Sequence, residues 1–183
     1  MLKYSVRLLV VAVLLGQILA CQTLAPEAVD DRASVVADGE TQASEEDPAQ
    51  SLYELAMWSA QNDKTADAIS QFEQVIAINP SFQRAYTNLG LLQLQQGELE
   101  QAKKSFENAI NQDKSDAIAY THLAVIQRQQ GEFAQAKQNY QKAIDIDADY
   151  AKAYLNYGIL LDIYLQDLTQ ALRQYETYQQ LLD

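Results

Sequence analysis

The sequence predicts an all-α fold, a right-handed superhelical solenoid of four helix pairs. Two observations lead to this prediction. A set of large apolar, small and glycine residues returns at a fixed spacing of 34 residues, and within each unit apolar residues recur at steps of three and four. The first observation indicates a stack of similar units, and the second indicates amphipathic helices. Neither helix of a pair could bury its apolar face alone, so the pairs must stack.

The repeats are predicted at residues 49–82, 83–116, 117–150 and 151–183. Each unit should hold two helices joined by a short turn. In chain order the predicted helices are Ser51–Gln61, Thr65–Ile78, Gln83–Gln96, Leu99–Gln112, Ala117–Gln130, Phe133–Ile146, Ala151–Leu165 and Leu168–Leu182.

The second repeat shows why each element is expected where it is. Gly97 stands at the end of the first helix, where the chain must turn and often needs a left-handed backbone. Small residues at Gly90 and Ala102 allow the two antiparallel helices to come close together. Phe106 is then expected to fill the space between this pair and the next. The third repeat carries the same pattern.

The fourth repeat departs from this pattern in two ways. It contains one extra residue between Gly158 and Ala171, and Tyr178 replaces the small residue found at Ala109 and Ala143. The last repeat is therefore expected to be specialised.

The repeated pattern resembles the tetratricopeptide repeat. The order in the family is a large residue, Leu-Gly, a turn glycine, alanine, an aromatic residue, alanine and proline. In the second repeat these residues are Tyr86, Leu89, Gly90, Gly97, Ala102, Phe106 and Ala109, and Pro80 ends the preceding unit. The resemblance covers residues 49–183. It implies a scaffold that binds other proteins, but it does not identify the partner, because one scaffold serves many functions.

The first 20 residues are predicted to be a signal peptide. Lys3 and Arg7 precede the apolar run Leu8–Ala20, which is too short for a comfortable transmembrane helix. The end of this run, Ile18-Leu19-Ala20-Cys21, resembles the lipobox of bacterial lipoproteins, in which the cysteine is acylated. A covalent lipid on Cys21 is therefore expected, with no other cofactor. The alternatives are a free thiol beside an ordinary cleavage site and a retained signal anchor.

Residues 21–48 are predicted to be the lipidated cysteine and a disordered acidic tether. From Gln22 to Pro48 there are eight acidic residues, one basic residue and no aromatic residue. Such a segment cannot bury enough apolar area to fold. Gln22 after the cysteine, by resemblance to enterobacterial sorting, points to the outer membrane, facing the periplasm. The tether is expected to be a solvated spacer, the alternative being recruitment of a basic partner.

Composition excludes several classes of function. A formal net charge of −12 argues against nucleic-acid binding, which needs a basic surface. A single cysteine allows no internal disulfide, and a single histidine excludes a multi-histidine metal site. His122 has no nucleophile positioned beside it in the sequence. We therefore expect no enzymatic activity and no metal.

The predicted binding surface is the concave face formed by the first helix of each pair. By resemblance to the family, repeat positions five and nine face this groove. Position five is Tyr53, Thr87, Thr121 and Leu155, and position nine is Met57, Leu91, Val125 and Ile159. Family members that grip acidic C-termini use Lys and Asn residues here, and this carboxylate clamp is absent. An amphipathic helix or an extended apolar segment is the expected ligand. The alternative is that the position-nine residues are simply core.

The C-terminal end offers a second candidate interface. The last predicted helix carries more apolar surface than a free end needs, namely Leu168, Leu172, Tyr175, Tyr178 and Leu182. Solenoids usually end in a helix with a polar outer side. Either this end packs on itself with its tyrosine hydroxyls in water, or it docks a partner or a second copy as a homodimer.

Together these features predict a non-enzymatic, lipid-anchored adaptor that binds another protein in the bacterial periplasm. The layout resembles lipoproteins of Gram-negative envelopes, among them those of type IV pilus biogenesis, so assembly of an envelope complex such as a pilus or secretin is the expected process. The alternative is a structural homo-oligomer that associates through its C-terminal repeat.

Overall fold

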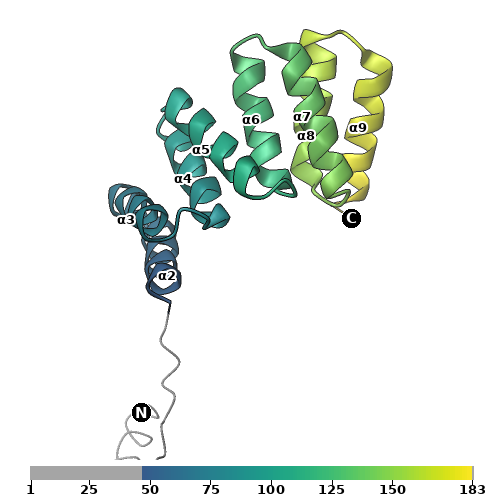
Figure 1. The fold of residues 1–183 in the computed structure, drawn as a ribbon. Coiled ribbons are helices and arrows are strands. Elements are labelled where there is room, and N and C mark those ends of the chain that lie inside the picture. Colours follow the sequence, from purple (N-terminus) through teal and green to yellow (C-terminus); the bar gives the residue numbers. More distant parts are fainter. Residues whose placement is uncertain (1–46, 183) are drawn as a thin grey trace, which may run out of the picture. The chain divides into compact units, whose positions relative to one another are not determined.

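A computed structural model describes residues 47–182 and shows eight α-helices and no β-strand over that range (Figure 1). The helices are α2 (Pro48–Gln61), α3 (Thr65–Ile78), α4 (Gln83–Gln95), α5 (Leu99–Gln112), α6 (Ala117–Gln129), α7 (Phe133–Ile146), α8 (Ala151–Ile159) and α9 (Leu168–Gln180), and the π-helical segment η1 (Leu160–Tyr164) follows α8 directly. None of these helices is long and apolar enough to cross a membrane. The predicted signal peptide, Cys21 and most of the tether lie outside the described residues.

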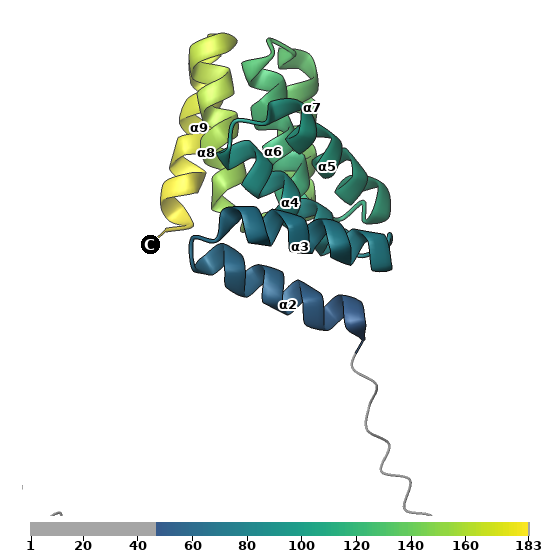
Figure 2. The ribbon, with the colours of Figure 1, turned by 90° about the vertical axis from the view of Figure 1, so that its left-hand side faces the viewer.

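The helices form four pairs, α2 with α3, α4 with α5, α6 with α7 and α8 with α9. Each second helix also packs on the first helix of the next pair, as Figure 2 shows for α3 beside α4. The predicted solenoid of four helix pairs is confirmed. The helix α2 begins at Pro48, and its N-cap Asp47 accepts a hydrogen bond from the backbone N–H of Ala49 at 3.0 Å.

One aromatic residue on each of α3, α5 and α7 packs inside its own pair and also against the next pair, as predicted for Phe106. Phe72, Phe106 and Tyr140 are all fully buried. A Cβ atom on Gly90 would lie 2.8 Å from the Cε1 atom of Phe106. A side chain at Gly90 would therefore displace the ring, and the first and third repeats have the small residues Ala56 and Ala124 at this position.

The turns inside the four pairs share a left-handed residue. The φ angles are 58° at Asp63, 79° at Gly97, 81° at Gly131 and 54° at Gln166. Only the middle two repeats place glycine there. The first and last repeats hold a residue with a Cβ atom in a conformation that costs it about 1–2 kcal/mol.

The extra residue of the fourth repeat is absorbed by η1. The backbone N–H of Leu165 donates to the carbonyl of Leu160 at 3.1 Å, the wider spacing of a π-helix. Leu160 and Leu161 are both fully buried in this segment. The prediction of one continuous helix over Ala151–Leu165 is therefore wrong in its last turn and a half. The π segment keeps the core leucines buried and lets Gln166 occupy the turn position of Gly131, one residue later.

Replacing Gln166 with glycine is expected to raise the free energy of unfolding by about 1 kcal/mol, because glycine adopts a positive φ without steric cost. The matched exchange, Gly131→Gln, should lower the free energy of unfolding by a similar amount. Urea denaturation of the three proteins measures both changes. Equal stability of all three would show that the turn conformation is unstrained.

Candidate functional site

The repeat unit has a pocket of about 660 Å³. It lies between α2, α4, the start of α6 and the end of α7. Its lining residues are Tyr53, Met57, Gln83, Arg84, Thr87, Asn88, Leu91, Asp113, Ser115, Asp116, Ala117, Ile118, Ile146 and Asp147. Three of the four first helices thus contribute to one concave site.

The apolar part of the pocket comes from Met57, Leu91, Ile118 and Ile146. Met57 and Leu91 are half-buried, because each also packs against a core cluster. Ile118 is 41% exposed. At position nine, Met57 and Leu91 therefore touch the core and also line the pocket, whereas Val125 and Ile159 do not line it.

A buried polar network fixes one wall of the pocket. The Gln83 side-chain amide donates to the Thr87 hydroxyl at 3.0 Å and also to the carboxylate of Asp116. The Thr87 hydroxyl donates to the same carboxylate oxygen. The other oxygen of Asp116 accepts from the backbone N–H of Ala119 at 2.8 Å and caps α6. The network ties α4 to the start of α6 and pre-organises the site.

Aromatic side chains hold the one cation of the pocket lining. The guanidinium carbon of Arg84 lies 5.2 Å from the ring centroid of Tyr53 and 5.8 Å from that of Phe82. Asn88 donates to the Tyr53 hydroxyl at 2.9 Å. Among residues 47–182 the one salt bridge joins Lys103 and Glu132, away from this site. Arg84 therefore rests on aromatic rings without a carboxylate partner.

Two further carboxylates lie on the rim, in the turns between repeats. One oxygen of Asp113 accepts from the backbone N–H of Ser115 at 2.8 Å and from its hydroxyl at 2.6 Å, and these bonds lower the pKa of Asp113. Asp147 accepts from the backbone N–H of Asp149 at 3.0 Å in the same way. With Asp116, three carboxylates face one cation in the pocket lining. The pocket lining therefore combines apolar side chains with three carboxylates.

The structure brings together half of the groove residues predicted from sequence. Tyr53, Met57, Thr87 and Leu91 all line the pocket. The other four do not: Val125, Leu155 and Ile159 are half-buried, and Thr121 is fully buried. The Thr121 hydroxyl donates to the carbonyl of Ala117 at 2.9 Å, so it has no surface to offer a ligand.

Sequence reasoning missed the turn residues Asp113, Asp116 and Asp147. A signal was present, because Asn79, Asp113 and Asp147 recur at the repeat spacing. All three side chains accept a hydrogen bond from the backbone N–H two residues later.

The C-terminal residues divide between packed tyrosines and exposed leucines. Tyr175 is half-buried beside Gly158, and its hydroxyl donates to Asp162 at 3.3 Å. Burial raises the pKa of Tyr175. Tyr178 is also half-buried. In contrast, Leu168, Leu172 and Leu182 are 66%, 58% and 57% exposed. Tyr175 packs on the core cluster shared by the third and fourth repeats, while the three leucines are exposed.

His122 is a packing residue in this structure. Its ring stacks on Phe106, with centroids 5.6 Å apart and an angle of 17°. The pKa of His122 is lowered to about 4, mainly by burial and also by the charge of Lys152, while Asp116 opposes both. Over residues 47–182, no three metal-binding side chains lie close enough to hold an ion.

Comparison with known proteins agrees with this architecture. Two models of tetratricopeptide repeats match residues 59–126 and 125–162. The helix pairs are therefore tetratricopeptide repeats. No curated protein sequence matches the chain.

Solved structures of MamA have the same fold. A crystal structure of MamA superposes with a TM-score of 0.65 at 21% identity, covering 74% of this chain and 78% of that one. MamA from Desulfovibrio magneticus RS-1, residues 41 to the end, gives a TM-score of 0.64 at 20% identity, covering 75% and 77%. At this identity the likeness concerns the fold alone.

Proposed function

We propose that this protein is a non-enzymatic scaffold that holds a segment of another protein in the pocket between α2, α4 and α6. Tetratricopeptide repeats of this kind form protein-interaction scaffolds, and this coarser function is supported by the family models and the fold. The observation that carries the finer proposal is the pocket itself. It is lined in part by apolar side chains, is large enough for several ligand side chains, and is braced by the network around Asp116.

The charges of the pocket suggest the chemistry of the ligand. Three carboxylates line the site, and its one cation, Arg84, is held on the rings of Tyr53 and Phe82. A ligand segment with apolar anchors for Met57 and Leu91 and a lysine or arginine near the rim complements this arrangement. This preference is opposite to that of a carboxylate clamp.

The place of action is part of the proposal. We propose that Cys21 carries an acyl lipid, that the acidic segment before Asp47 spaces the repeats from the outer membrane, and that the ligand is periplasmic. Assembly of an envelope complex such as a pilus or secretin fits this layout. Loss of fatty-acid labelling and of membrane partitioning in Cys21→Ser would support the anchor, and unchanged partitioning would contradict it.

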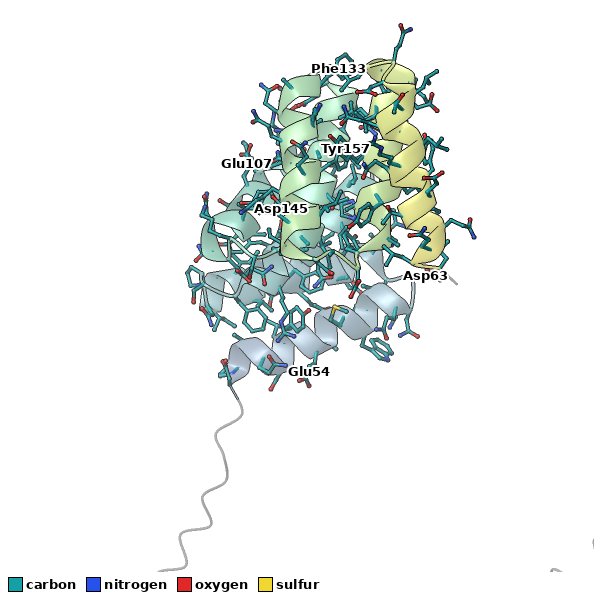
Figure 3. The ribbon with its side chains drawn as sticks, turned by 90° about the vertical axis from the view of Figure 1, so that its right-hand side faces the viewer. Glu54, Asp63, Glu107, Phe133, Asp145 and Tyr157 are labelled. Carbon is teal, nitrogen blue, oxygen red and sulfur yellow. The ribbon has the colours of Figure 1, made fainter. Side chains whose placement is uncertain are left out.

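Photo-crosslinking in the native cell tests the groove. A photoreactive residue at Leu91 should capture a discrete protein, and mass spectrometry of the adduct should identify the contacted segment. The control position is Glu107, exposed on α5 and labelled in Figure 3. Equal capture at both positions, or none at Leu91, would contradict the proposal.

Neutralising the rim is expected to weaken ligand binding without changing the fold. The first repeat supplies the matched residue, because Asn79 makes with Ser81 the same turn that Asp113 makes with Ser115. The double variant Asp113→Asn, Asp147→Asn should lower the affinity for the captured segment roughly threefold to tenfold and flatten its salt dependence. Isothermal titration at two salt concentrations measures both, and tighter binding by the variant would contradict a basic ligand.

A second candidate function is self-association through the C-terminal repeat. The exposure of Leu168, Leu172 and Leu182 favours it. Isolated exposed apolar residues are common on proteins, but here three leucines lie on or beside one terminal helix.

A further inference from the structure

The outer face of α2 is an inter-repeat contact surface with no described helix in front of it. Leu55 and Trp58 on this face are 47% and 50% exposed. At the position of Leu55, the later repeats carry Leu89, Leu123 and Tyr157, which are only 6%, 6% and 3% exposed. At the position of Trp58 they carry Leu92, which is half-buried, and Ile126 and Leu160, which are both fully buried.

The burial of these later residues has one cause. Each first helix after α2 packs on the second helix of the preceding pair, as α4 packs on α3. The residues at the two positions therefore serve to join one pair to the pair before it. Leu55 and Trp58 are apolar residues of the same kind, and over residues 47–182 no helix precedes α2 to cover them. The amino group of Lys64 lies 4.4 Å from the Trp58 ring centroid and partly covers it.

The outer face of α9 is the complementary surface. Allowing for the extra residue in η1, Leu172 takes the repeat position of Ile69 and Lys103. Ile69 packs in the cluster that also contains Leu89 of the next pair. Lys103 reaches the next pair as well, bonding Gln130 at 3.0 Å and Glu132 at 3.3 Å. Leu172 therefore faces the side on which a next first helix would lie, and it is 58% exposed.

We infer that α9 of one copy packs against α2 of a second copy, head to tail, so that the contact between successive helix pairs continues from one molecule to the next. The α2 surface carries Leu55 and Trp58, whose equivalents are buried or half-buried at the three contacts inside the chain, α3 with α4, α5 with α6 and α7 with α8. The α9 surface carries Leu172, whose equivalents Ile69 and Lys103 lie half-buried at the same contacts. Tyr178 stands where the inner contacts have the smaller Val75, Ala109 and Ala143, so the intermolecular helix lies farther out. This inference does not rest on the proposed pocket ligand.

Head-to-tail contact has a consequence that a symmetric dimer lacks. Because the two surfaces differ, each added copy leaves one free α2 and one free α9, and association continues into open chains. A symmetric dimer through α9 alone would stop at two copies and would not need α2.

Two single variants of the full chain test the inference. Trp58→Glu should disable only the α2 surface, and Leu172→Glu only the α9 surface. Each alone should weaken self-association at least tenfold in sedimentation runs over a range of concentrations, while an equal mixture should form pairs and no longer species. The control is Ile78→Glu, 53% exposed on α3, which should associate like the unchanged chain.

A crosslinking measurement keeps the test independent of any folding defect. A photoreactive residue at position 58 of the full chain should form adducts that map to α9 of another copy. Strictly monomeric behaviour of the unchanged chain would overturn the inference. Unweakened association of Trp58→Glu would do the same, as would adducts that map to the residues before Asp47 or to a different protein.

Discussion

Replacing Phe106 with alanine is expected to lower the free energy of unfolding by about 3–5 kcal/mol, the range for removing a large aromatic side chain from a core. Phe106 is fully buried, its ring approaches Gly90, and His122 of the next pair stacks on it. The ring therefore joins the helices of its own pair and also contacts the following pair. Its removal leaves a cavity at the centre of the solenoid, where neighbouring helices are held on both sides.

Urea denaturation followed by circular dichroism measures this loss. The control is Glu107→Ala on the same helix, an exposed position where the change should stay within about 0.5 kcal/mol. A loss below about 1 kcal/mol in Phe106→Ala would mean that the pairs close over the cavity, and that the inter-pair contact is softer than the burial of Phe106 indicates.

The helix pairs could be predicted because two periodicities agree. The step of three and four places apolar residues on one face, and the spacing of 34 residues fixes where each face meets the next pair. Where both hold, as in Thr65–Ile78 and Phe133–Ile146, the predicted and observed bounds are the same. The fourth repeat satisfies only part of the pattern. An inserted residue can lengthen a turn or widen a helix, and its sequence does not distinguish the two.

The structure shows what decides that choice. Leu160 and Leu161 stand at the repeat positions of the buried Ile126 and Gln127, and both are fully buried, so the widened segment takes up the extra residue without exposing them. A longer turn would have left the helical register intact up to the turn. This is a tertiary effect, and local sequence preference does not reveal it.

The site was less accessible to sequence reasoning than the fold. A repeat position on a first helix does not by itself determine whether its side chain faces the groove, and Thr121 shows why. Its hydroxyl bonds back to Ala117, whereas the equivalent Thr87 reaches across to Asp116. The two hydroxyls behave differently because Thr87 has the carboxylate of Asp116 within reach in the turn that ends its repeat. Pocket residues such as Asp113 and Asp147 come from turns that connect repeats. They reach the groove only because three helix pairs stack on one another.

His122 links the same core to pH. In the folded protein its pKa is lowered to about 4, mainly by burial, with Lys152 adding to the effect and Asp116 opposing it. In the unfolded chain the pKa of histidine is about 6.5. Between these two values the unfolded chain binds a proton that the folded protein does not. The stability that depends on neutral His122 is therefore complete above pH 6.5 and is lost as the pH falls towards 4.

The expected loss between pH 6.5 and pH 4 is up to about 3 kcal/mol, since each unit of pKa difference corresponds to about 1.4 kcal/mol. The matched variant is His122→Asn, because Asn88 and Asn156 stand at the same position of the neighbouring repeats. Carboxylates titrate equally in both proteins, so the difference between their urea denaturation curves at pH 7, 6, 5 and 4 isolates the histidine. Parallel stability of the two proteins across this range would show that His122 is hydrated and free to accept its proton in the folded state.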